Sequence, residues 1–89
     1  MKTRTFNTLK AVKLLNELGG GRVTVGEVAR WTNQSYSTAK RNLMKLRQWQ
    51  LVDYEVFTFA SRDCRDWFET DMGVAIYEEW QELPLGGAK

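Results

Sequence analysis

The chain has 89 residues and a net charge of +2; 43% of its residues are hydrophobic, and four Trp, four Phe and three Tyr accompany a single Cys and no His. This composition favours one small globular domain, residues 1–89, and excludes intrinsic disorder, a membrane span of roughly 20 apolar residues and an opening signal peptide. The single cysteine fits a reducing cytoplasm, and without a histidine base or a thiolate cluster we expect no enzyme activity, no metal and no cofactor.

Residues 5–18 form the first predicted helix, with Thr5 as its N-cap. Its apolar stripe is built on Leu9, Val12 and Leu15 and is broader than one neighbouring element needs. A run of three glycines then ends the helix, because glycine adopts the left-handed conformation of a helix stop without steric penalty. The three residues after the glycines are expected to be extended.

Residues 25–32 form the second predicted helix, which Thr24 and Glu27 open at the spacing of a capping box. A polar turn connects it to a third helix over residues 35–47, for which Ser35 is the expected N-cap. Two short helices joined by such a turn are a helix-turn-helix, in which the second helix is positioned to read DNA.

The two faces of this third helix differ in character. At about 100° per residue, Ala39, Leu43 and Leu46 fall on one stripe that is suited to burial. The opposite face carries Ser37 and Arg41, with further cations on its flanks. A helix that is apolar behind and bears hydroxyls and cations in front suits insertion into a DNA major groove, although a solvated basic helix would show the same pattern.

Residues 51–59 alternate in part between apolar and acidic side chains and predict a half-buried strand. The polar stretch 60–66 predicts a hairpin tip, and residues 67–69 return as a second strand. Thr70 then caps a last helix with an acidic outer face, and the tail 84–89 is expected to fray. The four tryptophans are all expected in the core, because a small domain needs large side chains to bury enough area: Trp31, Trp49, Trp67 and Trp80.

Charge is distributed unevenly along the chain. Residues 1–50 carry ten Lys and Arg against two acids, a net charge of +8, whereas residues 51–89 carry three basic residues against nine acids, a net charge of −6. Such a separation predicts one surface for a polyanion and another for solvent or a partner.

The order of helix, extended stretch, helix, turn, helix, hairpin and helix resembles the winged helix-turn-helix domain of bacterial, archaeal and phage regulators, MarR-like ones included. The resemblance covers nearly all of residues 5–83, the expected core of the domain. It implies an α+β, mostly helical fold with a three-helix core, a two-stranded wing and a C-terminal helix. The matching segments are 24–29 for the supporting helix, 35–43 for the recognition helix, 51–52 for the start of the wing and 69–73 for the Leu-Thr-x-x-Gly that often closes it.

Three features depart from this family pattern. Gln50 stands where a glycine often precedes the wing, and Glu69 stands at a position that is usually aliphatic. The turn between the second and third helices usually holds an apolar residue, and here the polar Thr32 and Gln34 flank that place. We therefore expect an atypical turn and an atypical wing.

The resemblance implies a transcriptional regulator that binds double-stranded DNA sequence-specifically, with helix 35–47 in the major groove and the wing near 60–66 on the backbone or in the minor groove. Arg41 could pair with guanine O6 and N7, or contact a phosphate. Since one such module makes few base contacts, we expect a homodimer through the first and last helices. The candidate DNA-binding residues are Ser35, Tyr36, Ser37, Thr38, Lys40, Arg41, Lys45, Arg62 and Arg65.

Several alternatives stay open at this point. Arg62 and Arg65 alternate with Asp63 and Asp66, so they could form surface ion pairs instead of contacting DNA. Met44, on the outward stripe, could touch a thymine methyl or pack under the wing. The whole domain could also be a protein–protein interaction module, or a subunit of a replication or phage assembly, with the acidic second half against a protein partner.

Overall fold

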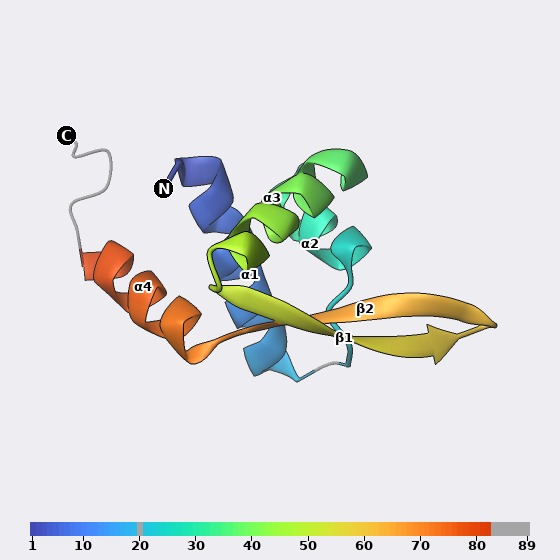
Figure 1. The fold of residues 1–89 in the computed structure, drawn as a ribbon. Helices are drawn as coiled ribbons and strands as arrows, with labels where there is room; N and C mark the ends of the chain where they lie inside the picture. Colours follow the sequence, from blue (N-terminus) through green and yellow to red (C-terminus); the bar gives the residue numbers. More distant parts are fainter. Residues whose placement is uncertain (20, 83–89) are drawn as a thin grey trace.

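The computed structural model describes residues 1–19 and 21–82, and the expected frayed tail at 84–89 lies outside these residues. Helices α1, α2 and α3 pack together as one body, a long β1–β2 hairpin extends from it, and α4 lies at the other end (Figure 1). The predicted α+β architecture is confirmed. The elements are α1 (Thr3–Leu18), α2 (Val25–Thr32), α3 (Tyr36–Gln48), β1 (Val52–Phe59), β2 (Arg62–Glu69) and α4 (Asp71–Glu82).

Helix α1 begins two residues earlier than predicted. Lys2 occupies the N-cap position without a side-chain capping bond, and Thr5 lies buried inside the helix, so the prediction of Thr5 as the cap was wrong. The physical reason is the packing of the next residue: the ring of Phe6 stacks on Tyr77 and Trp80 of α4, at centroid distances of 5.4 and 5.3 Å. Such tertiary packing holds the first turns in the helix more effectively than a cap does.

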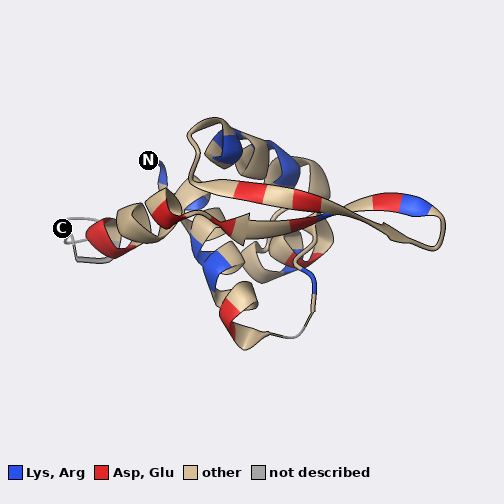
Figure 2. Cartoon of the chain, turned by 60° about the horizontal axis from the view of Figure 1, so that its bottom comes forward, with Lys and Arg blue, Asp and Glu red and all other residues tan. Residues whose placement is uncertain are grey.

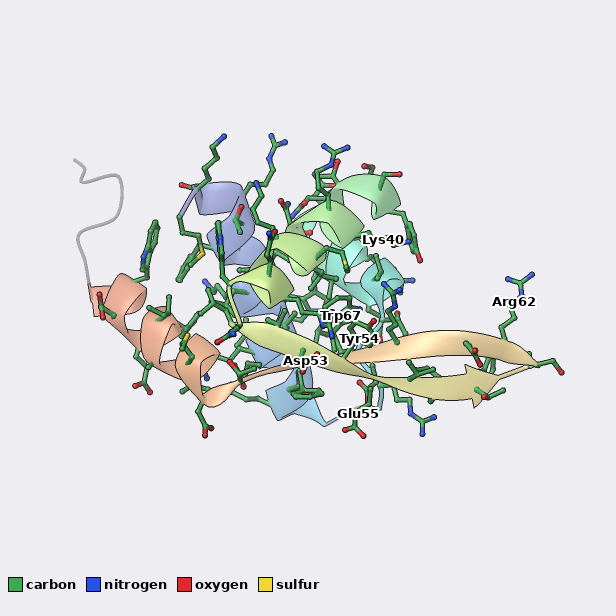
Figure 3. The ribbon with its side chains drawn as sticks, viewed as in Figure 1. Lys40, Asp53, Tyr54, Glu55, Arg62 and Trp67 are labelled. Carbon is green, nitrogen blue, oxygen red and sulfur yellow. The ribbon has the colours of Figure 1, made fainter. Side chains whose placement is uncertain are left out.

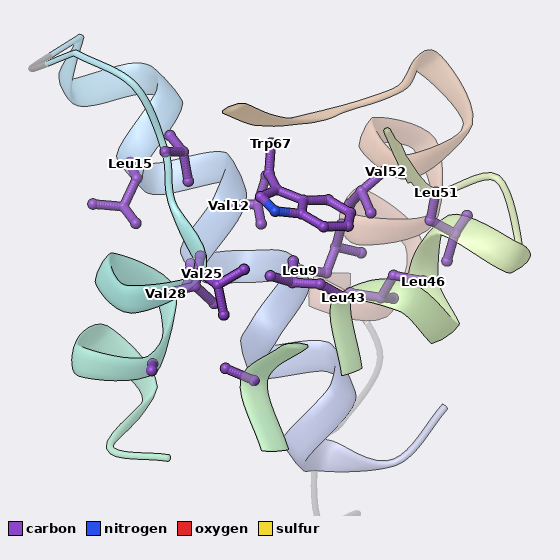
Figure 4. Close-up of a cluster of buried hydrophobic side chains, with 14 of the residues drawn as sticks. Leu9, Val12, Leu15, Val25, Val28, Leu43, Leu46, Leu51, Val52 and Trp67 are labelled. Atoms are coloured by element: carbon purple, nitrogen blue, oxygen red, sulfur yellow. The ribbon is translucent and has the colours of Figure 1, made fainter. Parts of the chain in front are cut away.

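The core lies where the three helices meet the root of the hairpin (Figure 4). Leu43 and Leu46 of α3 are fully buried there, as is Ala39, which confirms the stripe predicted for this helix. Leu9 of α1 and Trp67 of β2 close the core from the two other sides. The back of α3 is therefore held by packing, and only its other faces can meet a ligand.

The tryptophans do not all lie in this core. Trp67 is fully buried, and Trp80 is half-buried against the core. Trp31 and Trp49 are 51% and 46% exposed, so the prediction that all four build the core was wrong for these two. Both stand where a helix ends, Trp31 one residue before the end of α2 and Trp49 just after α3. At such a place fewer neighbouring elements are available to cover a large ring.

Strands β1 and β2 pair antiparallel over their full length, from Val52 opposite Glu69 to Phe59 opposite Arg62. The tip is only the pair Ala60–Ser61, whose φ angles of +52° and +64° suit a tight hairpin turn. The prediction that 60–66 forms the tip was therefore wrong beyond residue 61. Where the hairpin extends away from the rest of the domain, both faces of its strands can carry polar side chains. A polar stretch there can therefore be a strand as well as a turn.

The expected extended stretch after α1 touches the hairpin without forming a third strand. The backbone N–H of Trp67 donates to the carbonyl oxygen of Val23 at 2.9 Å, and the backbone N–H of Val23 donates to the carboxylate of Asp66 at 2.9 Å. These two bonds fix the root of the hairpin against the α1–α2 loop. Farther out, the guanidinium group of Arg22 lies 4.1 Å from the centre of the Phe57 ring, while Val56 is 61% exposed.

Helix α4 starts in close contact with the loop that precedes the wing. The hydroxyl of Thr70 accepts from the backbone N–H of Gly73 at 3.0 Å, as predicted for a cap, and donates to the carbonyl oxygen of Gln50 at 2.6 Å. A Cβ at Gly73 would overlap the carbonyl oxygen of Leu51 and come within 3.0 Å of its carbonyl carbon. Gln50 itself has φ +65°, a left-handed conformation that glycine adopts more easily.

Candidate nucleic-acid interface

Helix α3 presents an outward face on which every charge is positive. Ser37, Lys40, Arg41 and Lys45 are exposed, and the helix contains no acidic residue. Figure 2 shows basic residues on α3, acidic residues together with fewer basic ones on the hairpin, and acidic residues on α4. The ion pairs among residues 1–19 and 21–82 are Lys13–Glu17 and Arg47–Asp53, so these three outward cations have no ion-pair partner in that part of the chain.

Side-chain caps hold the starts of α2 and α3: Ser35 caps α3 as predicted, while of the capping box predicted for α2 only the bond to Thr24 is present among the described residues. The hydroxyl oxygen of Thr24 accepts from the backbone N–H of Glu27 at 3.3 Å. The hydroxyl oxygen of Ser35 accepts from the backbone N–H of Thr38 at 3.2 Å and the hydroxyl group donates to the Thr38 side chain at 2.9 Å. Ser35 and Thr38 thus bond to each other at the first turn of α3 while remaining at the surface.

A chain of polar side chains, which sequence analysis missed, ties the back of α3 to α1. The amide nitrogen of the buried Asn42 donates to the side-chain oxygen of Gln34 at 2.8 Å. Gln34 donates in turn to the hydroxyl of Thr8 at 3.1 Å, and Thr8 donates to the carbonyl oxygen of Arg4 at 3.0 Å. The signal was Gln34 near the usually apolar place in the turn, which required a polar partner behind it.

At its root the wing contacts α3 through the ring of Tyr54. The guanidinium groups of Arg47 and Arg65 each lie 4.6 Å from the centre of the Tyr54 ring. Nε of Arg47 also lies 2.9 Å from a carboxylate oxygen of Asp53, and this hydrogen bond lowers the pKa of the Asp53 carboxyl, helped by the backbone N–H of Tyr54. Figure 3 shows Tyr54 and Trp67 at this junction.

Arg65 does not lie at the tip of the wing as predicted. It stands opposite Val56 in the β1–β2 register, and its Nη1 lies 3.7 Å from the sulfur of Met44 on α3. Of the two roles considered for Met44, contact with the wing is therefore the observed one. Arg65 lies back from the tip because the turn is confined to Ala60–Ser61, and there its guanidinium group contacts the Tyr54 ring.

Arg62 is exposed and extends from the far end of the wing (Figure 3). The alternative that Arg62 and Arg65 form ion pairs with Asp63 and Asp66 was wrong for the described residues, whose ion pairs lie elsewhere. The carboxylate of Asp66 instead accepts from the α1–α2 loop.

A groove of about 540 Å³ opens between the start of α2, the first half of α3 and the wing. It brings together four of the nine predicted site residues, although they come from distant parts of the sequence. Three cations and one carboxylate line it, so its charge favours an anion. These four predicted residues and the carboxylate are Tyr36, Lys40, Arg62, Arg65 and Asp63.

The other predicted residues lie outside this wing-side groove. Ser35 and Thr38 line a second groove on the opposite flank of α3. Arg41 and Lys45 line a shallow hollow on the outward face of the helix, and Ser37 is exposed. All nine predicted residues thus lie at or beside α3 and the wing.

No protein-family model and no curated protein sequence matches the chain, whereas many solved structures resemble it. PadR of Bacillus subtilis, in complex with operator DNA, has a TM-score of 0.77 at 11% identity, over 93% of this chain and 49% of PadR. A MepR variant of S. aureus bound to an oligodeoxyribonucleotide has a TM-score of 0.74 at 17% identity, over 91% of this chain and 56% of MepR. A protein of Archaeoglobus fulgidus has a TM-score of 0.73 at 20% identity, over 91% of this chain and 84% of that protein.

The chain has the winged helix-turn-helix fold. It spans about half the length of PadR and MepR, and at these identities the likeness concerns the fold. In winged-helix terms, α2 and α3 are the helix-turn-helix, and the β1–β2 hairpin is the wing.

Away from α3, the winged-helix domain carries an acidic side chain at the junction of the wing and α4. Glu69 is half-buried, and its Oε2 atom is buried without a hydrogen-bond partner among the described residues. Burial raises the pKa of the Glu69 carboxyl, while the nearby Lys13 acts in the opposite direction. Glu69, in place of the usual aliphatic residue, therefore puts a carboxyl group at the base of the wing whose ionised form is destabilised by burial.

Two kinds of feature are absent from residues 1–19 and 21–82. No group of three or more His, Cys, Asp or Glu side chains there is placed to hold a metal ion. No helix in that part of the chain is long and apolar enough to cross a membrane.

Proposed function

We propose that the protein is a transcriptional regulator that binds double-stranded DNA sequence-specifically, with α3 in the major groove. The outward face of α3 carries the proposal: it is exposed, it holds Lys40, Arg41 and Lys45, and the helix has no acid. The major groove is about 12 Å wide and admits one α-helix. Hydroxyls and cations are the groups that contact phosphates and base edges. The DNA complexes of PadR and of the MepR variant agree with this proposal.

The position of each residue on α3 suggests its role. Ser37 and Arg41 lie on the outward stripe, so they would approach base edges, where Arg41 can pair bidentately with guanine. Lys40 and Lys45 flank that stripe and would contact phosphates. Arg62, at the far end of the wing, would reach the backbone or the minor groove, whose negative potential attracts arginine.

A homodimer through α1 and α4 belongs to the same proposal. Leu18 of α1 is 69% exposed and Met72 of α4 is 51% exposed, while Ile76 and Trp80 are only half-buried in the monomer. Dimerisation would cover apolar area and join two DNA half-sites. Sedimentation showing only monomer at high micromolar concentration contradicts this part of the proposal.

A protein-interaction module is the second candidate, and the exposed acids of α4 favour it. Glu78 and Glu79 are exposed, and the end of the molecule that bears them is separate from α3 (Figure 2). A module of this kind would bind a basic protein partner through α4 and would bind duplex DNA weakly at every salt concentration.

Selection of bound sites from random duplex DNA tests the proposal. We expect a recurrent motif, which is palindromic if the protein is a dimer. Arg41→Ala should weaken binding to that motif by about 1–3 kcal/mol and relax the preference at one base pair. Arg30→Ala is the matched control, because Arg30 is also exposed but lies in the last turn of α2. Failure to enrich any motif contradicts sequence-specific binding.

A further inference from the structure

The second groove at the start of α3, here called the α1-side groove, has a volume of about 450 Å³. Three segments meet in it: the first turns of α1, the α2–α3 turn and the first turn of α3. It shares no lining residue with the wing-side groove. Arg4 and Asn7 of α1 line one wall, and Thr38 of α3 lines another.

The side chains of the α1-side groove suit an anion. All of its lining residues carry a hydroxyl, an amide or a guanidinium group, and none is acidic. The hydroxyl groups of Thr32 and Ser35 already donate within the protein, so the other side chains would supply the donors. Arg4 supplies the one formal charge, and it is exposed and has no ion-pair partner among residues 1–19 and 21–82. The same chemistry, a cation among neutral donors, is what proteins use to hold a phosphodiester group.

The two grooves lie on opposite flanks of the outward face of α3. At about 100° per residue, Tyr36 and Lys40 fall on the flank that lines the wing-side groove, and Thr38 falls on the other. Arg41 lies between them. An α-helix seated in a major groove has one phosphate backbone along each of its flanks. One strand would therefore pass the wing-side groove, and the other strand would pass the α1-side groove.

From this geometry we infer that the α1-side groove binds a backbone phosphate of the second DNA strand, through Arg4 with Asn7 beside it. This inference rests on the proposed function and extends the interface to α1, from which no binding residue was predicted. The groove thereby determines how deeply and at what angle α3 sits, because phosphate contacts fix the register of a protein on the duplex.

The polar chain behind α3 makes this groove ready to bind. The carbonyl oxygen of Arg4 accepts from Thr8, which is linked through Gln34 to Asn42 of α3. The backbone of α1 that carries Arg4 is therefore tied to α3 by hydrogen bonds. A site whose two walls are already fixed loses less entropy when it binds a ligand.

The test measures binding of a short mixed-sequence DNA duplex at a series of salt concentrations. Arg4→Gln should lower affinity about threefold to tenfold at low salt, and should reduce the slope of log K against log salt by about 0.9, the value for one phosphate. Arg4→Lys should keep the slope. Lys10→Gln is the matched control: Lys10 is an exposed cation of the same helix and does not line the groove. It should leave the slope unchanged.

A second variant tests whether the α1-side groove binds DNA without a change in the protein's charge. Asn7→Ala, at another exposed position of α1, should weaken binding while the salt slope stays the same, because no cation is removed. Thermal unfolding of each variant shows whether the fold is retained. An unaltered affinity for both Arg4→Gln and Asn7→Ala overturns the inference.

Two further outcomes separate this inference from the proposed function. If Arg4→Gln and Lys10→Gln reduce the slope equally, net charge explains the effect and the groove assignment falls. If Lys40→Gln reduces the slope and Arg4→Gln does not, the inference falls while the proposed function stands. If the native protein binds the duplex without salt dependence, both fall together.

Discussion

Replacing Gly73 with alanine should destabilise the domain more than any conservative surface change. The added Cβ would overlap the carbonyl oxygen of Leu51, so the start of α4 and the loop before the wing must separate. Such overpacking costs about 1–3 kcal/mol. Separation also weakens the two bonds by which Thr70 holds this loop, to Gln50 at 2.6 Å and to Leu51 at 3.1 Å, each contributing about 0.5–1.5 kcal/mol.

We therefore expect Gly73→Ala to lower the free energy of unfolding by about 3 kcal/mol, and the melting temperature by more than about 10 °C. Urea unfolding followed by tryptophan fluorescence measures the change. Gly26→Ala is the matched control, because Gly26 also lies in a helix but the nearest atom to its added Cβ is 3.9 Å away. It should stabilise the protein by up to about 1 kcal/mol. A loss below about 0.5 kcal/mol for Gly73→Ala would show that the Leu51 carbonyl group moves aside at little cost, contrary to this prediction.

Three further changes test other contacts by urea unfolding. Gln50→Gly should raise stability by about 0.5–1 kcal/mol, because glycine has no Cβ and adopts this left-handed backbone conformation without steric strain, whereas Gln50→Ala should not. Asn42→Ala should cost about 1–3 kcal/mol, since the Gln34 oxygen loses its buried donor; an unchanged midpoint contradicts this. The raised pKa of the Glu69 carboxyl means that the folded state binds its proton more tightly than the unfolded state, so this group's contribution to stability falls as pH rises through the raised pKa. Glu69→Gln should accordingly be more stable than the native protein at pH 7 and lose that advantage below about pH 4. An advantage that persists at low pH would contradict this account.

Local signals in the sequence were sufficient for most of the fold. The caps at Thr24, Ser35 and Thr70 hold the backbone N–H groups predicted for them. The buried stripe of α3 followed from periodicity alone, because Leu43 and Leu46 lie at helical spacing. Side chains whose partners are near in sequence could thus be placed without the structure.

Long-range contacts could not be predicted in the same way. The position of Arg65 depends on a ring of β1 and a sulfur of α3, and the exposure of Trp31 depends on which elements happen to cover the end of α2. The length of the wing was underestimated because a hairpin that leaves the body no longer needs an apolar face. Arg4 was missed for a similar reason, since its groove forms only when α1 packs beside the α2–α3 turn.

The proposed function requires the outward face of α3 to meet duplex DNA. Its most direct test is the affinity for a DNA duplex, measured at several salt concentrations, of the native protein and of the double variant Lys40→Gln/Arg41→Gln. Lys10→Gln/Arg30→Gln is the control with the same change in charge. We expect the α3 variant to lose affinity and its log–log salt slope to fall by about 0.9, the value for the one phosphate contact assigned to Lys40, while the control stays near the native protein. Equal affinity and slope for the α3 variant and the native protein would contradict it.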